Sequence, residues 1–114
     1  MSDPLFDENR FLHSLADDME LARELLSAFM EDSPERSASL GKALAENDAD
    51  QASKMAHSLK GMCGVVRSGE MSDLAMNMEH SAKSGDLDAT RKSYGEFVKK
   101  LETALEEMRR FLAR

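Results

Sequence analysis

The scarcity of β-branched residues is the feature that most limits what this chain of 114 residues can fold into. The sequence has no Ile, and its only Val and Thr residues are Val65, Val66, Val98, Thr90 and Thr103. Strands favour β-branched and aromatic side chains because these pack well on a pleated surface. The chain is instead filled with Ala, Leu, Met, Glu, Lys and Arg, which are strong helix formers. We therefore expect an all-α fold.

Charge and cysteine content narrow the class of protein further. The chain has 15 Lys and Arg against 22 Asp and Glu, a net charge of −7, which argues against binding to nucleic acid or to an anionic membrane. A single cysteine cannot form an internal disulfide and indicates a reducing compartment. Residues 1–9 do not resemble a signal peptide, and no stretch resembles a transmembrane span. We expect a soluble cytoplasmic protein with one domain, residues 1–114.

Apolar residues recur with a period near 3.6 along most of the chain. A short helix is expected at residues 7–16, followed by four longer amphipathic helices joined by short turns. The inner stripe of the first long helix is expected to contain Leu21, Leu25, Ala28 and Phe29. At Pro34 this helix either kinks or gives way to a new helix, and the sequence leaves both open. The pattern predicts an antiparallel four-helix bundle with a short additional N-terminal helix.

The expected helix at residues 50–68 has two contrasting faces. At 100° per residue, the side opposite His57 is apolar and faces the core. It contains Ala52, Met55, Leu59, Met62, Cys63 and Val66. Two cations, two glycines and a serine lie within about 60° of His57 on the same wheel. They are Lys54, Lys60, Gly61, Gly64 and Ser68. The imidazole is therefore expected to point into solvent.

Two glycines on the solvent face of a helix need an explanation. Each costs about 0.5–1 kcal/mol relative to Ala. Gly61 and Gly64 would leave bare backbone beside the imidazole, so that a partner surface can come close to the ring. Residues 51–69 also contain three cations, Lys54, Lys60 and Arg67, and no acid. Because Lys60 lies three positions after His57, the two side chains are neighbours, and we infer a local anion site.

Residues 56–61, with the sequence AHSLKG, resemble the signature of histidine phosphotransfer (HPt) domains, the intermediate carriers of phosphorelays. The resemblance covers most of the chain, and its His-x-Leu-Lys-Gly motif is specific. Further matching positions lie on both sides of the motif. They are Phe29, Asp32, Pro34, Leu40 and Asp48 upstream, and Leu74, Ala75, Met78 and Glu79 downstream.

This resemblance implies a role for each residue of the exposed face. His57 would carry the phosphoryl group, and Lys60 would neutralise its charge. Gly61 and Gly64 would let a receiver domain dock, and the docking face would extend over Lys54, Arg67 and Ser68. HPt domains take the phosphoryl group from an aspartate of one receiver domain and pass it to another. The expected partners are response-regulator receiver domains and a hybrid sensor histidine kinase.

The chemistry expected from the resemblance is that of a monomeric stoichiometric phosphocarrier rather than an enzyme. Imidazole is a good nucleophile near neutral pH. Phosphoryl transfer depends on in-line positioning and on charge stabilisation, so a bare helix face with one lysine suffices when the partner supplies the rest. The chain has no nucleotide-binding glycine loop, and we expect no cofactor or metal of its own. Mg²⁺ is expected on the receiver.

Three residues depart from the family pattern: Met62, Val65 and Arg67 stand where members often carry small residues, Asn and Gly. Met62 is interpreted as a packing change. Arg67 puts a long cation at the edge of the docking face, where it either selects receivers or only solvates the helix end. The sequence favours neither interpretation.

Other functions are weaker interpretations of the same residues. One is a helical adaptor that binds a receiver or kinase without phosphotransfer. A metal site built from His13, His57 and His80 lacks the repeated Glu-x-x-His spacing of bundle metal sites. His13 and His80 are taken as surface residues, and Glu79 as part of a surface ion pair of little value. Cys63 lies on the apolar face and is expected to be an inert core residue.

Overall fold

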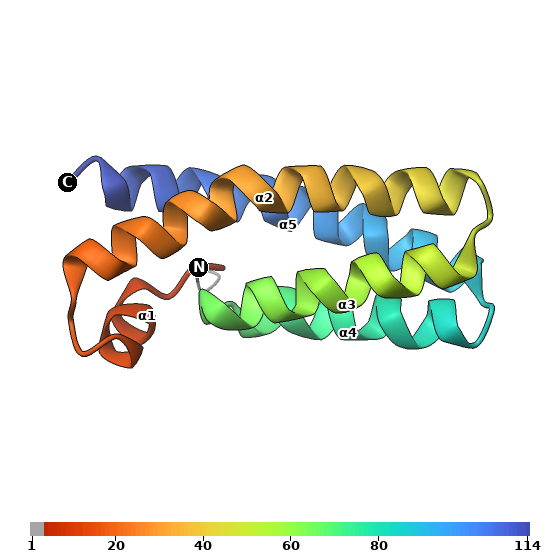
Figure 1. Ribbon diagram of the computed structural model, residues 1–114, viewed down its shortest axis with the longest axis horizontal. Coiled ribbons are helices and arrows are strands. Elements are labelled where there is room, and N and C mark those ends of the chain that lie inside the picture. The colour runs from red at the N-terminus through yellow and green to blue at the C-terminus, as the bar shows by residue number, and fades with distance from the viewer. Residues whose placement is uncertain (1–3) are drawn as a thin grey trace.

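The computed structural model describes residues 4–114, and this part of the chain is all-helical. Four long helices lie side by side in an antiparallel bundle, and a short helix lies at one end (Figure 1). The expected fold class is confirmed. The helices are α1 (Glu8–Ser14), α2 (Met19–Ala45), α3 (Ala49–Val65), α4 (Gly69–Lys83) and α5 (Leu87–Leu112).

The long helices contact one another in a closed ring. α3 packs against α2 and α4, and α5 closes the ring by packing against α4 and α2. α3 therefore has a neighbour on either side, while α5 is diagonal to it. The face of α3 that points away from the bundle is left open to solvent.

The three turns between the long helices are built alike. Each contains three residues, of which the middle one has positive φ and the last occupies the N-cap position of the next helix. Asn47 and Arg67 adopt φ values of 55° and 61°, and Gly85 adopts 82°. In the second turn the N–H of Arg67 donates to the carbonyl of Gly64, and that of Ser68 to the carbonyl of Cys63. This bonding pattern is a Schellman motif, which ends a helix by satisfying its last carbonyl groups.

Helix α2 runs through Pro34 without a break, which settles the question that the sequence left open. Proline lacks the N–H that would bond to the carbonyl four residues earlier, so a bend is expected there. In Figure 1 the direction of α2 changes partway along its course. One long bent helix can therefore follow α3 and α5 over most of the bundle.

The inner stripe predicted for the first half of α2 is partly wrong. Phe29 is buried as expected, but Leu21 is 37% exposed, Ala28 is exposed and Leu25 is half-buried. The residues that face the core are instead Ala22, Leu26, Phe29, Ser33, Ser37, Leu40, Ala43 and Leu44. Small serines can occupy the narrow interface between helices, so the buried stripe is not the most apolar one. The apolar residues on its flank remain at the surface.

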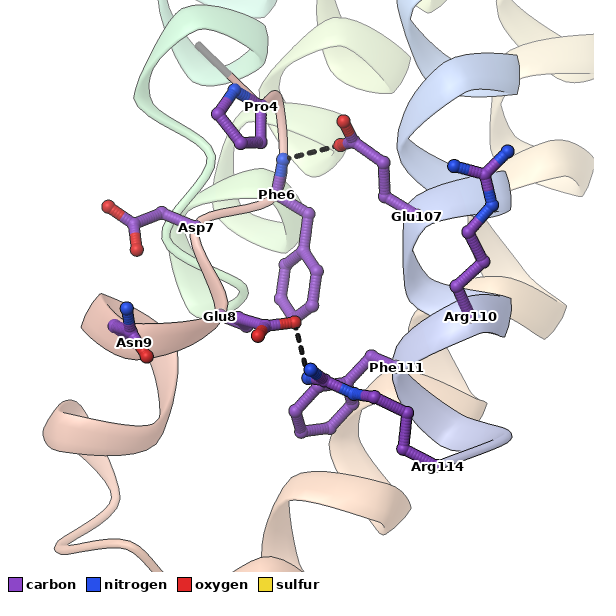
Figure 2. A pocket seen from close by; sticks show the side chains of 9 residues that line it. All are labelled: Pro4, Phe6, Asp7, Glu8, Asn9, Glu107, Arg110, Phe111 and Arg114. Carbon is purple, nitrogen blue, oxygen red and sulfur yellow. Dashed lines mark hydrogen bonds and ion pairs between the residues drawn. The ribbon is translucent and has the colours of Figure 1, made fainter.

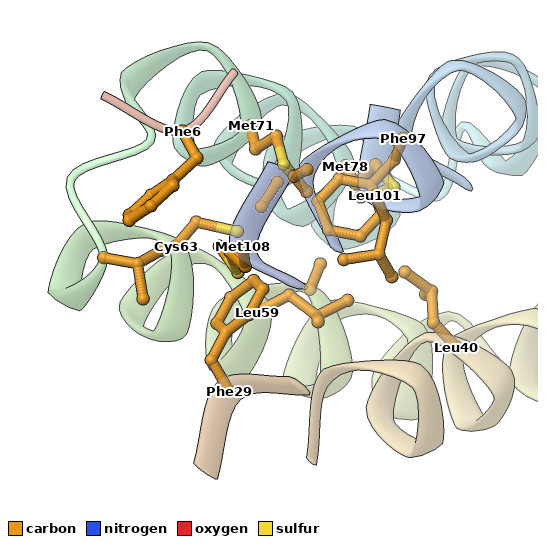
Figure 3. Packing of buried hydrophobic residues seen from close by; sticks show 14 of the residues in the cluster. Phe6, Phe29, Leu40, Leu59, Cys63, Met71, Met78, Phe97, Leu101 and Met108 are labelled. Carbon is orange, nitrogen blue, oxygen red and sulfur yellow. The ribbon is translucent and has the colours of Figure 1, made fainter. Parts of the chain in front are cut away.

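The core fills the space between the four long helices (Figure 3). Phe29, Leu59 and Cys63 approach it from α2 and α3, and Met78 and Phe97 from α4 and α5. Burial raises the pKa of the Cys63 thiol from 9.0 to about 12. The thiol is therefore protonated and unreactive at neutral pH.

The N-terminal segment closes one end of the bundle. Phe6 is buried and makes edge-to-face contacts with Phe11 and Phe111, at centroid distances of 5.5 and 5.7 Å. Its backbone N–H donates to Oε1 of Glu107 on α5 at 2.9 Å (Figure 2). Glu8 forms an ion pair with Arg114 beside an open hollow of about 750 Å³. These contacts fix the segment to the last turns of α5.

Candidate functional site

His57 lies midway along α3 and points into solvent, as the helical wheel predicts. Its side chain is 67% exposed. The opposite face of α3 is buried at Ala52, Leu59 and Cys63, and Ala56 is buried beside it. Because the apolar face anchors α3 to the bundle, the imidazole has no freedom to turn inward.

A buried carboxylate on the neighbouring helix holds the imidazole. Oε2 of Glu79 on α4 lies 2.9 Å from Nδ1 of His57, and the Glu79 side chain is only 6% exposed. An ionised carboxylate accepts hydrogen bonds but cannot donate them, so Nδ1 must carry the proton. In the neutral form of the ring, the lone pair is then on the other ring nitrogen, Nε2. The partner of Nδ1 thus fixes the tautomer of His57.

Glu79 also binds two lysines. Nζ of Lys60 lies 2.8 Å from Oε1, and Nζ of Lys83 lies 3.1 Å from Oε2. The hydrogen bond from Lys60 lowers the pKa of Glu79, and the hydrogen bonds from Lys83 and His57 lower it further by smaller amounts. Burial of the carboxylate raises the pKa. The net effect is a pKa lowered from 4.5 to about 2. Glu79 is therefore ionised at neutral pH. One carboxylate shared by two ammonium groups leaves an excess positive charge beside the imidazole.

The sequence-based interpretation of Glu79 was right that it pairs with nearby cations but wrong that it lies at the surface. It is not part of a weak surface ion pair but the buried centre of the cluster that contains His57, Lys60 and Lys83. Two signals in the sequence point toward it. Residues 51–69 contain cations and no acid, which calls for a compensating acid on a neighbouring helix. Glu79 and Lys83 also have the spacing of ion-paired neighbours on one helix.

The two glycines beside His57 expose backbone, as expected. A Cβ atom built on Gly61 or Gly64 meets no atom within 4 Å, so neither glycine is required by packing within the chain. Lys54 is exposed on the same helix and forms an ion pair with Asp50 at 3.1 Å. The region around His57 is therefore accessible, and its charge is partly compensated.

Ser68 does not belong to this face. α3 ends at Val65 rather than at residue 68, and Ser68 is only 1% exposed. Its hydroxyl donates to the carbonyl of Leu5 at 2.7 Å, which ties the N-terminal segment to the turn before α4. The wheel failed here because it extended the helix through a turn, where the angle between successive residues no longer holds.

Arg67 is exposed and occupies the left-handed position of the same turn. Glycine adopts this conformation without steric cost, whereas other residues are strained there. The departure from the family pattern at this position therefore replaces a favourable turn residue by a strained one. Its guanidinium forms no ion pair within residues 4–114.

On the side of α3 that faces α2, Arg36 lies next to the site. Its Nη1 donates to Oγ of Ser58 at 2.5 Å. Arg36 comes from the second half of α2, beyond Pro34, and no pattern in the sequence points to it. His57 is thus flanked by a lysine cluster toward α4 and by a guanidinium toward α2.

The metal-binding alternative finds no support in the described residues. Nowhere within residues 4–114 do three or more His, Cys, Asp or Glu side chains come together in a way that could hold a metal ion. His13 and His80 are exposed. Within the same range, no helix is long and apolar enough to cross a membrane.

The fold and the site together are a helical bundle that presents an exposed, carboxylate-held histidine midway along one of its helices. A family model described as the Hpt domain matches residues 24–111, and the chain belongs to that family. The match extends from the first turns of α2 nearly to the end of α5 and leaves α1 outside. Neither the curated proteins nor the solved structures contain a match to the chain.

Proposed function

We propose that the protein accepts a phosphoryl group on Nε2 of His57 from a phospho-aspartyl receiver domain and passes it to the aspartate of another receiver. Membership of the Hpt family supports a phosphorelay role and interaction with receiver domains. The observation that carries the more specific proposal is the hydrogen bond between Nδ1 of His57 and Glu79. It leaves Nε2 as the nucleophile.

In the proposed step, the Nε2 lone pair attacks the phosphorus atom of the acyl phosphate. The N–P bond forms as the P–O bond to the aspartate breaks, and the aspartate leaves as a carboxylate. The proton on Nδ1 stays in its hydrogen bond to Glu79. The ring gains positive charge during this step, and the adjacent carboxylate stabilises that charge. Return of the group to a second receiver follows the same path in reverse.

Lys60 is proposed to stabilise the phosphoryl oxygens. Its side chain is one-third exposed, and its Nζ lies 2.8 Å from Oε1 of Glu79. An ammonium group has three donors, so Lys60 can keep the bond to Glu79 while it donates to a phosphoryl oxygen. The second lysine on the carboxylate, Lys83, helps to keep Glu79 ionised while Lys60 is shared in this way.

Gly61 and Gly64, with Lys54 and Arg67, are proposed to form the surface on which the receiver docks. The open space around both glycines supports this assignment. Ser68 is excluded from the docking surface by its burial. We also propose that the receiver supplies Mg²⁺ and the acceptor aspartate, and that the chain is a stoichiometric carrier rather than a catalyst.

We further propose that the protein works as a cytoplasmic monomer, with a hybrid sensor histidine kinase as the source of the phosphoryl group. The single cysteine, which is buried in the core, supports a reducing location. The net charge of −7 supports a soluble carrier that does not associate with itself.

The test is incubation of the protein with a panel of phosphorylated receiver domains. We expect label on the chain that is labile to acid and stable to base, as a phosphoramidate is, and no label on the variant His57→Gln. Retention of all donor phosphate on aspartate across the panel would contradict the proposal. An adaptor would keep its signalling activity in the His57→Gln variant, whereas a carrier would lose it.

A further inference from the structure

Two arginines line one small hollow at the end of the bundle where α3 ends and α4 begins. Arg10 comes from α1, which lies at this end (Figure 1), and Arg67 comes from the turn between α3 and α4. The hollow has a volume of about 140 Å³ and is lined by Arg10, Gly64, Arg67, Ser68, Gly69 and Ser72. Gly64 is seven positions after His57, which is about 10 Å along the helix axis. The hollow is therefore separate from the cluster around His57.

The guanidinium groups of Arg10 and Arg67 have no partner within residues 4–114. Neither forms an ion pair or a hydrogen bond there, whereas the guanidinium of every other arginine in the chain forms at least one. The net charge of the chain is −7, yet no acid is among the described residues that line the hollow. Glu70, the acid next to Gly69, pairs with Lys100 instead. Two like charges at one hollow repel each other unless an anion compensates them.

The backbone of Arg67 also indicates that its side chain has a function. Arg67 has a φ of 61°, a left-handed conformation that glycine adopts freely and that strains other residues. The turn between α4 and α5 has Gly85 at the same position, with a φ of 82°. Contacts within the described chain do not offset the strain at Arg67, because its guanidinium makes none. A bound anion gives this side chain a contact that does.

The two guanidinium groups fit a phosphate better than a carboxylate. An arginine binds either anion through two parallel hydrogen bonds, so one arginine already occupies both oxygens of a carboxylate. A phosphate has oxygens for arginines from two directions. At neutral pH a phosphate group carries a charge of about −1.5 to −2, which matches the two positive charges of Arg10 and Arg67.

The remaining residues of the hollow leave room for such a group. A Cβ atom built on Gly64 or Gly69 meets no atom within 4 Å, so bare backbone lines the hollow at both positions. The hydroxyl groups of Ser68 and Ser72 donate to backbone carbonyls of the chain itself. The free side-chain donors of the hollow are therefore the two guanidinium groups.

We propose that this hollow binds a phosphate group, either as the free anion or as a monoester, between Arg10 and Arg67. Arg10 precedes residue 24, where the match to the Hpt family begins, and Arg67 is a departure from the family pattern. The site is therefore a property of this chain rather than of the family. It does not depend on the proposed function, because none of His57, Lys60 and Glu79 lines the hollow.

The experiment adds inorganic phosphate to the wild-type protein at constant ionic strength and follows it by ¹H–¹⁵N NMR. We expect saturable shifts of the amide signals of Gly64 and Gly69 and of the Nε–H signals of Arg10 and Arg67. Methyl phosphate, added in place of inorganic phosphate, identifies the source of the group. Tighter binding of methyl phosphate assigns the hollow to a phosphorylated group of another molecule, and tighter binding of inorganic phosphate assigns it to the free anion. Both results support the proposal.

Variants separate the two arginines from charge in general. Arg10→Gln and Arg67→Gln should each weaken phosphate binding by about tenfold, because each removes one charge-assisted contact. Arg23→Gln is the matched control. It changes the net charge by the same amount, and the guanidinium of Arg23 donates to the carbonyl of Leu112 away from the hollow, so this variant should bind phosphate normally. Circular dichroism verifies that each variant is folded, and Arg67→Gly replaces Arg67→Gln if the latter is not.

The proposal is overturned if phosphate causes no saturable shift at Gly64 and Gly69, or if the shifts are confined to the cluster around His57. Normal binding by the folded Arg10 and Arg67 variants would also overturn it, as would an equal loss in Arg23→Gln. Binding of acetate as tight as that of phosphate would assign the hollow to carboxylates and count against the proposal too.

Labelling of His57 by the small donor phosphoramidate tests the proposed function separately. If Arg10→Gln is labelled normally but binds phosphate poorly, the hollow is a site apart from the phosphoryl acceptor, as proposed. If no donor labels the wild-type chain while phosphate still binds between Arg10 and Arg67, the proposed function fails and the phosphate site stands.

Discussion

Nδ1 of His57 lies 2.9 Å from Oε2 of Glu79, so a buried carboxylate on α4 fixes the orientation of an exposed imidazole on α3. The two residues are 22 positions apart in the chain and meet because α3 and α4 are antiparallel neighbours. The hydrogen bond between His57 and Glu79 therefore depends on the packing of α3 against α4. It also gives predictions that differ from those for a histidine that is simply exposed.

Replacement of Glu79 by Gln should slow transfer from a phosphorylated receiver to His57 by about tenfold or more. The amide keeps the size of the side chain but removes the charge that stabilises the positively charged ring, a preorganised electrostatic effect. Single-turnover transfer kinetics measure this change. Glu70→Gln is the control on the same helix, because Glu70 forms an ion pair with Lys100 and its side chain is 55% exposed. Equal rates for Glu79→Gln and wild type would contradict the assigned role.

The contribution of Glu79 to stability should depend on pH in a defined window. Its pKa is lowered from 4.5 to about 2 in the folded protein, so the unfolded chain binds the proton first as pH falls. The stabilisation is therefore fully present above pH 4.5 and is lost as the pH falls toward 2. Urea unfolding of the wild type and of Glu79→Gln should differ most near pH 6 and converge near pH 2. A difference that is constant across this range would be inconsistent with the ion-pair cluster.

Substitutions at Gly61 and Gly64 should affect stability and function in opposite directions. Gly→Ala in a helix interior raises stability by about 0.5–1 kcal/mol, and the added Cβ meets no atom within 4 Å at either position. Transfer from a receiver should slow, and should slow further with Gln at the same position, while labelling by phosphoramidate is unchanged. Gly95→Ala on α5 has equally open surroundings and should gain stability without slower transfer. Unfolding curves and transfer rates on the same samples check both effects.

Arg67→Gly should stabilise the protein by up to about 1 kcal/mol, because glycine relieves the strain of the left-handed position. Arg67→Ala removes the same charge and leaves the strain, so it should bring no such gain. Thermal unfolding of the two variants isolates the backbone effect. Receiver binding measured on the same pair decides between the two interpretations of Arg67: weaker binding in both variants assigns the side chain to docking, and unchanged binding assigns it to the helix end.

Gly41→Ala should destabilise the protein by about 1–3 kcal/mol, as expected for overpacking. A Cβ atom at this position would lie 2.5 Å from the Tyr94 hydroxyl oxygen, which donates to the carbonyl of Ser37 at 2.9 Å. Denaturant unfolding measures the loss. Combination with Tyr94→Phe, which removes the clashing oxygen, should recover part of it. A gain in stability from the single substitution would show that Tyr94 moves away without cost.

The sequence predicted most of the fold because helix formation and amphipathic pattern are local properties. Its errors occurred where position depends on neighbouring helices. Leu25 and Ala28 are as apolar as core residues, and only the rotation of α2 against α3 and α5 leaves them at the surface. Ser68 was misplaced because the helix ends three residues earlier than the pattern suggests. Around Pro34 the local sequence allows either a break between two helices or one bent helix, and packing along the bundle is compatible with the single bent helix.

For the candidate site, too, some features follow from the sequence and others only from the tertiary structure. By itself the sequence determined that the fold is helical, that His57 points into solvent opposite an apolar face, and that Gly61 and Gly64 lie beside it, since all three follow from composition and from the helical repeat. Only the tertiary structure brought Glu79 against His57 and Lys60, and Arg36 against Ser58. Side chains on different helices meet according to the order and rotation of those helices. The periodicity of a single helix contains no information about either.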